Sequence, residues 1–304
     1  MRSGLGLAFF FLSSLLGLPA CWVPVGVDFL EVQAKLDPKL TPVERAVLEK
    51  DLVRFLEVSL GNYAQPMYRA LFGGDDLAAV TVFLNERVNY VLSSTRATDE
   101  LMQSERHQAR TKGQVQAFNI GAHYFLKSLG AVLNGEDSYQ FEDFYGARIP
   151  IRSSRLGVIQ LGEVYQSEEF LAREGDSLRR MGVWVHEARH SDCTGGLNSG
   201  DYDRLAQGLL PASKGCTHLH EACPKGTIYG GILACDLHPW GAYFVGATYH
   251  AAIAFNCRGC SESEKQTAMM AQVDNLAKIE PRLLDDMLSG RLGAPDLSHQ
   301  EVIF

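Results

Sequence analysis

Residues 183–193 read VWVHEARHSDC, and this stretch contains the spacing His-Glu-x-x-His at His186, Glu187 and His190. On a helix, side chains four residues apart share one face, so both imidazoles can bind the same metal ion. Glu187 lies beside them and can reach a water molecule bound to that ion. Zinc lowers the pKa of such a water toward about 7, and a nearby carboxylate can then take its proton. The spacing therefore predicts a zinc site with His186 and His190 as ligands and Glu187 as general base.

The stretch resembles the active-site helix of the zincin metallopeptidases. The preceding turn, residues 183–185, is apolar as in that family, and a region with strand-like alternation lies before the helix. The resemblance implies a zinc-dependent hydrolase, most simply a metallopeptidase, in which Glu187 acts as general base and general acid. It rests on residues 183–193 and on the coarse order of elements, and it identifies no closer family.

Three residues depart from the zincin pattern. Arg189 places a charge between the two histidines, and Asp192 stands where a hydrophobic residue is usual. Gly196 occupies the position of the third histidine of the metzincin subclass, which excludes that subclass. Two other interpretations stay open. In one, Glu187 and Arg189 are solvated and the histidines only pack; in the other, a metal binds without catalysis.

A catalytic zinc site needs a third protein ligand. The stretch CTHLHEAC places His218 and His220 two residues apart, so in an extended segment both imidazoles face the same way. Cys216 and Cys223 flank them, and a disulfide from either would hold the segment in place. We predict His220 as the third ligand. The rival candidates are His218, Asp236, His238 and His250. Tyr243 could stabilise an oxyanion, or it could simply pack in the core.

The first residues, MRSGLGLAFFFLSSLLGLPAC, combine one arginine with a short apolar run, which is typical of a secretory signal rather than of a spanning helix. Residues 18–21 resemble the lipobox of bacterial lipoproteins. This implies that Cys21 carries palmitate-type acyl chains and becomes the mature N-terminus, attached to a membrane by its lipid. Trp22 follows the cysteine, and in such lipoproteins the absence of Asp there favours the outer membrane. The alternative is a plain signal peptide that is cleaved near Ala20.

Six cysteines remain after Cys21, and all follow the His-Glu-x-x-His stretch. They are Cys193, Cys216, Cys223, Cys235, Cys257 and Cys260. An even number in an exported protein predicts three disulfides, although the sequence leaves their pairing open. Cys257 and Cys260 could instead form a redox pair, but no thioredoxin-like strand and helix precede them. A structural role is the prediction.

The periodicity of the chain predicts an α+β fold. Apolar spacing predicts helices over 43–60, 77–94 and 115–135, then strands over 147–154 and 156–165, then helices over 178–192, 240–255 and 261–279. We expect a signal peptide over 1–20, a tether over 21–40, a helical region over 41–144, and a zincin-like, disulfide-stapled catalytic region over 145–304. That last region would hold a small sheet and the His-Glu-x-x-His helix.

Composition narrows the class of partner. The net charge is −8 and no basic stripe is present, so nothing indicates a nucleic-acid-binding protein. The prediction is an exported, lipid-anchored zinc hydrolase that acts on a peptide or another cell-envelope substrate. The alternative is a non-enzymatic envelope lipoprotein whose disulfide-stapled region binds a partner.

Overall fold

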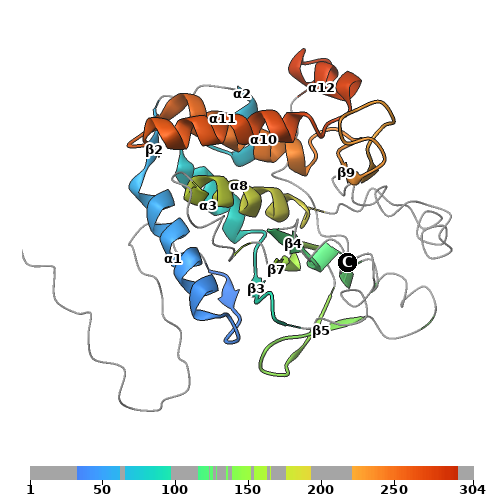
Figure 1. Cartoon of the computed structure of the whole chain (residues 1–304). Helices are drawn as coiled ribbons and strands as arrows, with labels where there is room; N and C mark the ends of the chain where they lie inside the picture. Colours follow the sequence, from blue (N-terminus) through green and yellow to red (C-terminus); the bar gives the residue numbers. More distant parts are fainter. Residues whose placement is uncertain are drawn as a thin grey trace, which may run out of the picture. The chain divides into compact units, whose positions relative to one another are not determined.

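The described residues include a four-stranded mixed sheet (Figure 1). The computed structural model describes residues 33–61, 66–96, 116–122, 124–125, 128, 135, 139–151, 154–162, 165, 176–192 and 221–293. The strand order is β1 (Lys35–Leu36), β3 (Tyr90–Leu92), β7 (Val158–Leu161) and β4 (Ala117–Asn119). The first three strands are parallel, and β4 joins the edge antiparallel to β7. β3 and β7 are buried at every position, as the apolar run VIQL of β7 requires in a covered sheet.

The helices pack around α8 (Asp176–Arg189). It contacts α1 (Pro42–Glu57), α3 (Leu77–Asn85), α10 (Ala242–Asn256) and α11 (Glu262–Leu276), and it also contacts β4. Figure 1 shows α8 between the sheet and the pair formed by α10 and α11, with α1 alongside. The smaller elements are α2 (Pro66–Phe72), α12 (Pro281–Leu288), η1 (Ser154–Leu156), and the paired strands β2 (Ser59–Leu60) with β10 (Cys257–Arg258), β5 (Gln140–Glu142) with β6 (Arg148–Pro150), and β8 (Glu221–Ala222) with β9 (Leu233–Cys235).

Two helices begin with complete capping boxes. Thr41 accepts a hydrogen bond from the Glu44 backbone N–H at 3.1 Å, and the Glu44 carboxylate accepts one from the Thr41 N–H at 2.8 Å. Ser261 and Glu264 form the same reciprocal pair at the start of α11. Both boxes satisfy backbone donors that a helix start leaves without a partner, so these two boundaries follow from local sequence.

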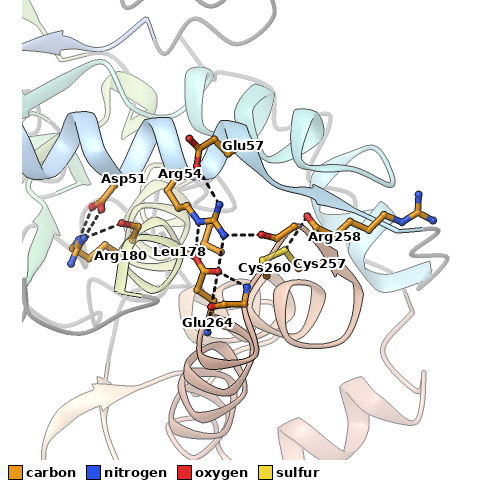
Figure 2. A network of polar contacts seen from close by, with 12 residues as sticks. Asp51, Arg54, Glu57, Leu178, Arg180, Cys257, Arg258, Cys260 and Glu264 are labelled. Atoms are coloured by element: carbon orange, nitrogen blue, oxygen red, sulfur yellow. Dashed lines mark hydrogen bonds and ion pairs between the residues drawn. A yellow bond between two sulfur atoms is a disulfide. The ribbon is translucent and has the colours of Figure 1, made fainter.

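Two long-range ion pairs tie α1 to the helices around it (Figure 2). Asp51 accepts two hydrogen bonds from the Arg180 guanidinium of α8, at 2.5 and 2.6 Å, and both side chains are buried. Arg54 donates two hydrogen bonds to Glu264 of α11, at 2.6 and 2.7 Å. Bidentate arginine–carboxylate pairs fix geometry as well as charge, so they set the position of α1 against α8 and α11.

Several predicted elements are confirmed, and two change type along their length. The helices expected over 178–192, 240–255 and 261–279 are α8, α10 and α11, and the predicted strands contain β6 and β7. The helix predicted over 77–94 is wrong beyond Asn85, because residues 90–92 form the central strand β3. The start of the helix predicted over 115–135 is also wrong, because residues 117–119 form β4. Strand pairing with β7 overrides local helical spacing at both places.

Residues 32–304 form one compact unit. Residues 33–40, which the sequence assigns to a tether, take part in it. The Lys35 N–H donates to the Asn89 carbonyl at 2.8 Å, the Asp37 N–H donates to the Val91 carbonyl at 2.9 Å, and Leu40 is buried. The sheet also combines strands from before and after residue 145. No helix in the described part of the chain combines the length and apolar character needed to cross a membrane.

Two disulfides are present among the described residues. Cys223 pairs with Cys235, which closes the turn between β8 and β9, and Cys257 pairs with Cys260 at the end of α10. Cys193 and Cys216 lie outside the described residues, as does Cys21. The Cys257–Cys260 disulfide lies beside the Arg54–Glu264 ion pair in Figure 2, where Arg54 also donates to the Gly259 carbonyl at 2.8 Å. This setting favours the structural role.

Candidate metal centre

His186, Glu187 and His190 come together at the C-terminal end of α8. Each offers one ligand atom, and these atoms lie within 4.8 Å of one another. The two imidazole centroids are 5.0 Å apart, and all three residues are buried. The C-terminal end of α8 narrows through three successive backbone hydrogen bonds between residues three apart. The N–H groups of residues 190, 191 and 192 donate to the carbonyls of residues 187, 188 and 189. The local sequence therefore places two imidazoles and a carboxylate in one buried group.

Glu187 is held by the end of the edge strand β4. Its Oε2 accepts a hydrogen bond from the Asn119 backbone N–H at 2.8 Å, and its Oε1 is 3.9 Å from His186 Nε2. The Asn119 side-chain amide donates to the Glu187 carbonyl at 2.8 Å and to Ser191 Oγ at 2.7 Å. One asparagine thus orients the carboxylate with its main chain and braces the last turn of the helix with its side chain.

The electrostatics of this group fit a divalent cation. Burial raises the pKa of Glu187 to about 8, and the Asn119 N–H opposes that rise. Burial disfavours the ionised carboxylate, and a nearby cation would favour it. Neutral imidazole nitrogens and a carboxylate are also the donor types that zinc prefers. His186 and His190 could therefore hold a metal, with Glu187 adjacent.

Arg189 and Asp192, the two charged departures from the zincin pattern, contact each other. Arg189 Nη1 donates to Asp192 Oδ2 at 3.1 Å, and Arg189 Nε donates to the Trp240 carbonyl at 2.8 Å. Arg87 Nε lies 2.9 and 2.8 Å from the two Asp192 oxygens, and Arg155 Nε lies 3.3 Å away. Glu187 and Arg189 are both buried, which excludes the interpretation in which they are solvated.

Among the residues that the structure describes, Trp240 is the non-glycine residue that has a positive φ, at 59°. A bulky side chain rarely adopts this left-handed conformation, so the surroundings must hold it there. The Trp240 carbonyl accepts a hydrogen bond from Arg189, and the Trp240 N–H donates to the Met287 sulfur at 3.4 Å. The end of α8 that carries His186 and His190 is thereby joined to the segment just before α10.

Three rival candidates for the third ligand lie outside the group of His186, Glu187 and His190. Asp236 is buried and accepts hydrogen bonds from the backbone N–H groups of Tyr243 at 2.8 Å and Phe244 at 3.3 Å, so it caps α10. His250 is buried against Gly182 of α8, and burial lowers its pKa to about 3, which keeps its imidazole neutral. His238 is half-buried and is also not part of the group. His218 and His220 lie outside the described residues, so His220 stays a prediction.

Tyr243 contacts the group directly. Its ring lies edge-on to His186 with centroids 4.5 Å apart, and Lys278 Nζ lies 4.9 Å from its ring centroid. Burial raises the pKa of Tyr243 far above its usual range, and the charges of Asp236 and Glu187 add to the effect. The phenol therefore stays protonated and can donate a hydrogen bond.

Two glycines let the helices approach this closely. A Cβ at Gly182 of α8 would overlap the His250 imidazole of α10. A Cβ at Gly246 of α10 would lie 2.9 Å from Asn275 Nδ2 of α11 and 3.8 Å from His186 Cβ. A contact of 2.9 Å is tighter than carbon normally tolerates, so both positions suit glycine. These contacts bring α10 and α11 against the face of α8 that carries His186.

Sequence reasoning missed Asn119, Arg87 and Arg155. The spacing Asn-x-Gly at 119–121 does predict a local turn, and Asn119 Oδ1 accepts from the Gly121 N–H at 2.9 Å. Nothing in the sequence links that turn to Glu187, which is 68 residues away. Comparison with protein-family models, with curated proteins and with solved structures finds no match, so the site is interpreted from its own geometry.

Proposed function

We propose that this protein is an exported zinc-dependent hydrolase, and specifically a metallopeptidase. The observation that carries the proposal is the buried group of His186, Glu187 and His190, with ligand atoms within 4.8 Å of one another. Its support is chemical. Glu187 is buried beside the two imidazoles, where burial disfavours its ionised form and a nearby cation would favour it. A metal ion would supply the compensating charge.

Each part of the proposed hydrolysis can be assigned to a residue of this chain. His186 and His190 would hold the metal, and His220 is the proposed third ligand. A zinc ion held there would supply Lewis acidity toward a carbonyl group and toward a water molecule near neutral pH. Glu187 takes the proton of the attacking water and passes it to the leaving amine, and Asn119 keeps the carboxylate aimed. Tyr243, beside His186, donates a hydrogen bond to the developing oxyanion.

The charged network beside the site supports a rigid centre. Asp192 is held by guanidinium groups from Arg87, Arg155 and Arg189, which come from different parts of the chain. Catalytic groups must keep their geometry to within a fraction of an ångström. The ion pairs of Asp192 hold the C-terminal end of α8 in one position, which meets that requirement.

Export and anchoring are proposed from the N-terminal sequence. Residues 1–20 would be a lipoprotein signal peptide, and Cys21 would carry the lipid that attaches the protein to the envelope, in the outer membrane. Acyl chains that bury many CH2 groups, about 0.8 kcal/mol each, are enough for such an anchor.

Metal content and one isosteric variant test the function. The purified mature protein should contain about one zinc per chain by mass spectrometry, as a four-coordinate site requires. Glu187→Gln should keep that zinc and lose hydrolysis of a mixed fluorogenic peptide library, because it removes the base and leaves both imidazoles. His190→Ala should lose the zinc. A metal-free parent that a chelator does not affect would exclude the proposal and favour the non-enzymatic lipoprotein.

A further inference from the structure

His190 lies one residue beyond Arg189, the last α-helical residue of α8. Its N–H donates to the Glu187 carbonyl, three residues back, at 3.1 Å. A turn closed in this way is tighter than an α-helical turn, and its hydrogen bonds have poorer geometry. The spacing of the two histidines brings His190 close to His186, but contacts from outside the helix must hold this last turn in one conformation.

The side chain of Asn119, at the end of β4, supplies two such contacts. Asn119 Nδ2 donates to the Glu187 carbonyl at 2.8 Å and to Ser191 Oγ at 2.7 Å. These two acceptors lie on either side of His190 in the chain. Asn119 Oδ1 accepts from the Gly121 N–H at 2.9 Å, which fixes the orientation of the amide. All three bonds are buried, so a single amide joins the edge strand to the turn that carries His190.

Ser191 extends this contact to the turn between α3 and β3. Its Oγ accepts from Asn119 and donates to the Arg87 carbonyl at 2.8 Å. Gly157 packs against the same carbonyl, because a Cβ at this residue would lie 1.7 Å from the Arg87 oxygen and 3.1 Å from Ser191 Oγ. Ser191 is fully buried, so water does not compete for its hydroxyl group. The end of α8 is therefore held between two other parts of the chain by one run of hydrogen bonds.

We propose that Asn119 and Ser191 are positioning residues for the metal site: their hydrogen bonds hold His190 where its imidazole can share a metal ion with His186, and so they set the metal affinity. This inference rests on the proposed function, of which it needs the metal site but not the cleavage of peptides. The two ring centroids are 5.0 Å apart, and a shift of the last turn would change that separation. Groups that orient metal ligands are worth about 10- to 100-fold in metal affinity.

The zinc affinity of the purified protein tests this role. The dissociation constant for Zn²⁺ is measured by competition with a chromophoric chelator for the parent, Asn119→Ala and Ser191→Ala. Asn119→Ala keeps the backbone N–H that binds the Glu187 carboxylate and removes only the side-chain bonds. Each variant should bind zinc about tenfold or more weakly than the parent. Affinity equal to that of the parent in either folded variant would overturn the inference.

The double variant Asn119→Ala with Ser191→Ala shows whether the two residues act together. Each single variant already removes the hydrogen bond between Asn119 Nδ2 and Ser191 Oγ. The loss of zinc affinity in the double variant should therefore be smaller than the product of the two single losses. Losses that multiply fully would mean that the two side chains act separately, which contradicts the proposed run of hydrogen bonds.

Gln160→Ala on β7 is the matched control. The Gln160 side chain is buried in the same sheet, and its Nε2 also donates to two acceptors, the carbonyls of Ser93 at 3.2 Å and Arg96 at 2.8 Å. Its loss should lower the stability in urea by a similar amount, because two buried hydrogen bonds are removed in each case. Zinc affinity should stay at the level of the parent. A loss of affinity as large as that of Asn119→Ala would assign the effect to general destabilisation and overturn the inference.

Peptide hydrolysis by the same proteins separates this inference from the proposed function. A parent that binds zinc but cleaves no peptide would exclude the peptidase, and the zinc affinities of the variants would still decide the role of Asn119 and Ser191. A parent that binds no zinc would overturn both proposals. If circular dichroism shows that Asn119→Ala does not fold, the affinity of Ser191→Ala decides the outcome alone.

Discussion

Arg189 donates a hydrogen bond to Asp192 at 3.1 Å, so the two charged residues that depart from the zincin pattern are partners. Asp192 is buried and also binds Arg87 and Arg155. Neither departure places a charge into the group formed by His186, Glu187 and His190. The charged pair instead fixes the end of the helix that carries this group.

Removing the charge of Asp192 should be strongly destabilising. Asp192→Asn leaves buried guanidinium groups without their shared carboxylate, which costs about 3–5 kcal/mol of the free energy of unfolding. Urea denaturation of the parent and of Asp192→Asn measures this loss of stability. Asp75→Asn is the control, because the Arg69–Asp75 pair is exposed, and it should unfold at the same urea concentration as the parent. A small effect of Asp192→Asn would show that the network is not needed for stability.

Gly182 and His250 should show strong coupling. Gly182→Ala places a methyl group where the His250 imidazole lies, and overpacking of this kind costs about 1–3 kcal/mol. The double variant Gly182→Ala with His250→Ala should recover part of that loss, because the imidazole no longer occupies the space. A double-mutant cycle by chemical denaturation measures the coupling. Additive effects would mean that helices α8 and α10 relax freely at this contact.

The Arg54–Glu264 pair should contribute to acid unfolding. The Arg54 guanidinium holds the pKa of Glu264 below its usual value, although burial opposes this. A lowered folded pKa stabilises the protein above the unfolded pKa of about 4.3, and this stability is lost as the pH falls through the folded value. Glu264→Gln should therefore reduce stability by about 1 kcal/mol at pH 7, since Arg54 is partly solvated.

The difference between Glu264→Gln and the parent should shrink as the pH falls below about 4. Glutamine still completes a capping box, so the variant isolates the ion pair from the cap at Ser261. Thermal unfolding between pH 3 and pH 7 follows this difference. A difference that stays constant with pH would assign the effect to packing instead.

If the protein is exported as proposed, all six cysteines after Cys21 should be oxidised. Cys223–Cys235 and Cys257–Cys260 are already paired, which leaves Cys193 and Cys216 for the third disulfide. Thiol labelling before reduction should find no free thiol among them, and mass mapping should find the Cys193–Cys216 link. Two labelled thiols at those positions would point to a thiolate role instead.

Cys21→Ser should release the protein from membranes. Acyl chains on Cys21 would supply the anchor, and no helix in the described part of the chain could span a bilayer in their place. Fractionation of cells that express the parent or the variant measures the change. Processed Cys21→Ser protein that stays with the membrane would contradict lipid anchoring.

Local signals in the sequence were sufficient for the helix that carries His186, Glu187 and His190, because its ligand spacing depends only on helical geometry. The capping boxes at Thr41 and Ser261 likewise depend only on residues three apart in the sequence. Helical spacing failed beyond Asn85 and at residues 117–119. There, pairing with β7, which is distant in the sequence, decided the structure.

The surroundings of the site could be found only in the tertiary structure. Asn119 reaches Glu187 across 68 residues, and Arg87 reaches Asp192 across 105. Such contacts depend on which strand lies at the edge of the sheet and how closely α10 approaches α8. The sequence pattern likewise did not indicate the partners of Arg189 and Asp192. In that pattern, both residues are only departures from the zincin motif. Their burial shows that long-range charge pairing, rather than local propensity, determined what these residues do.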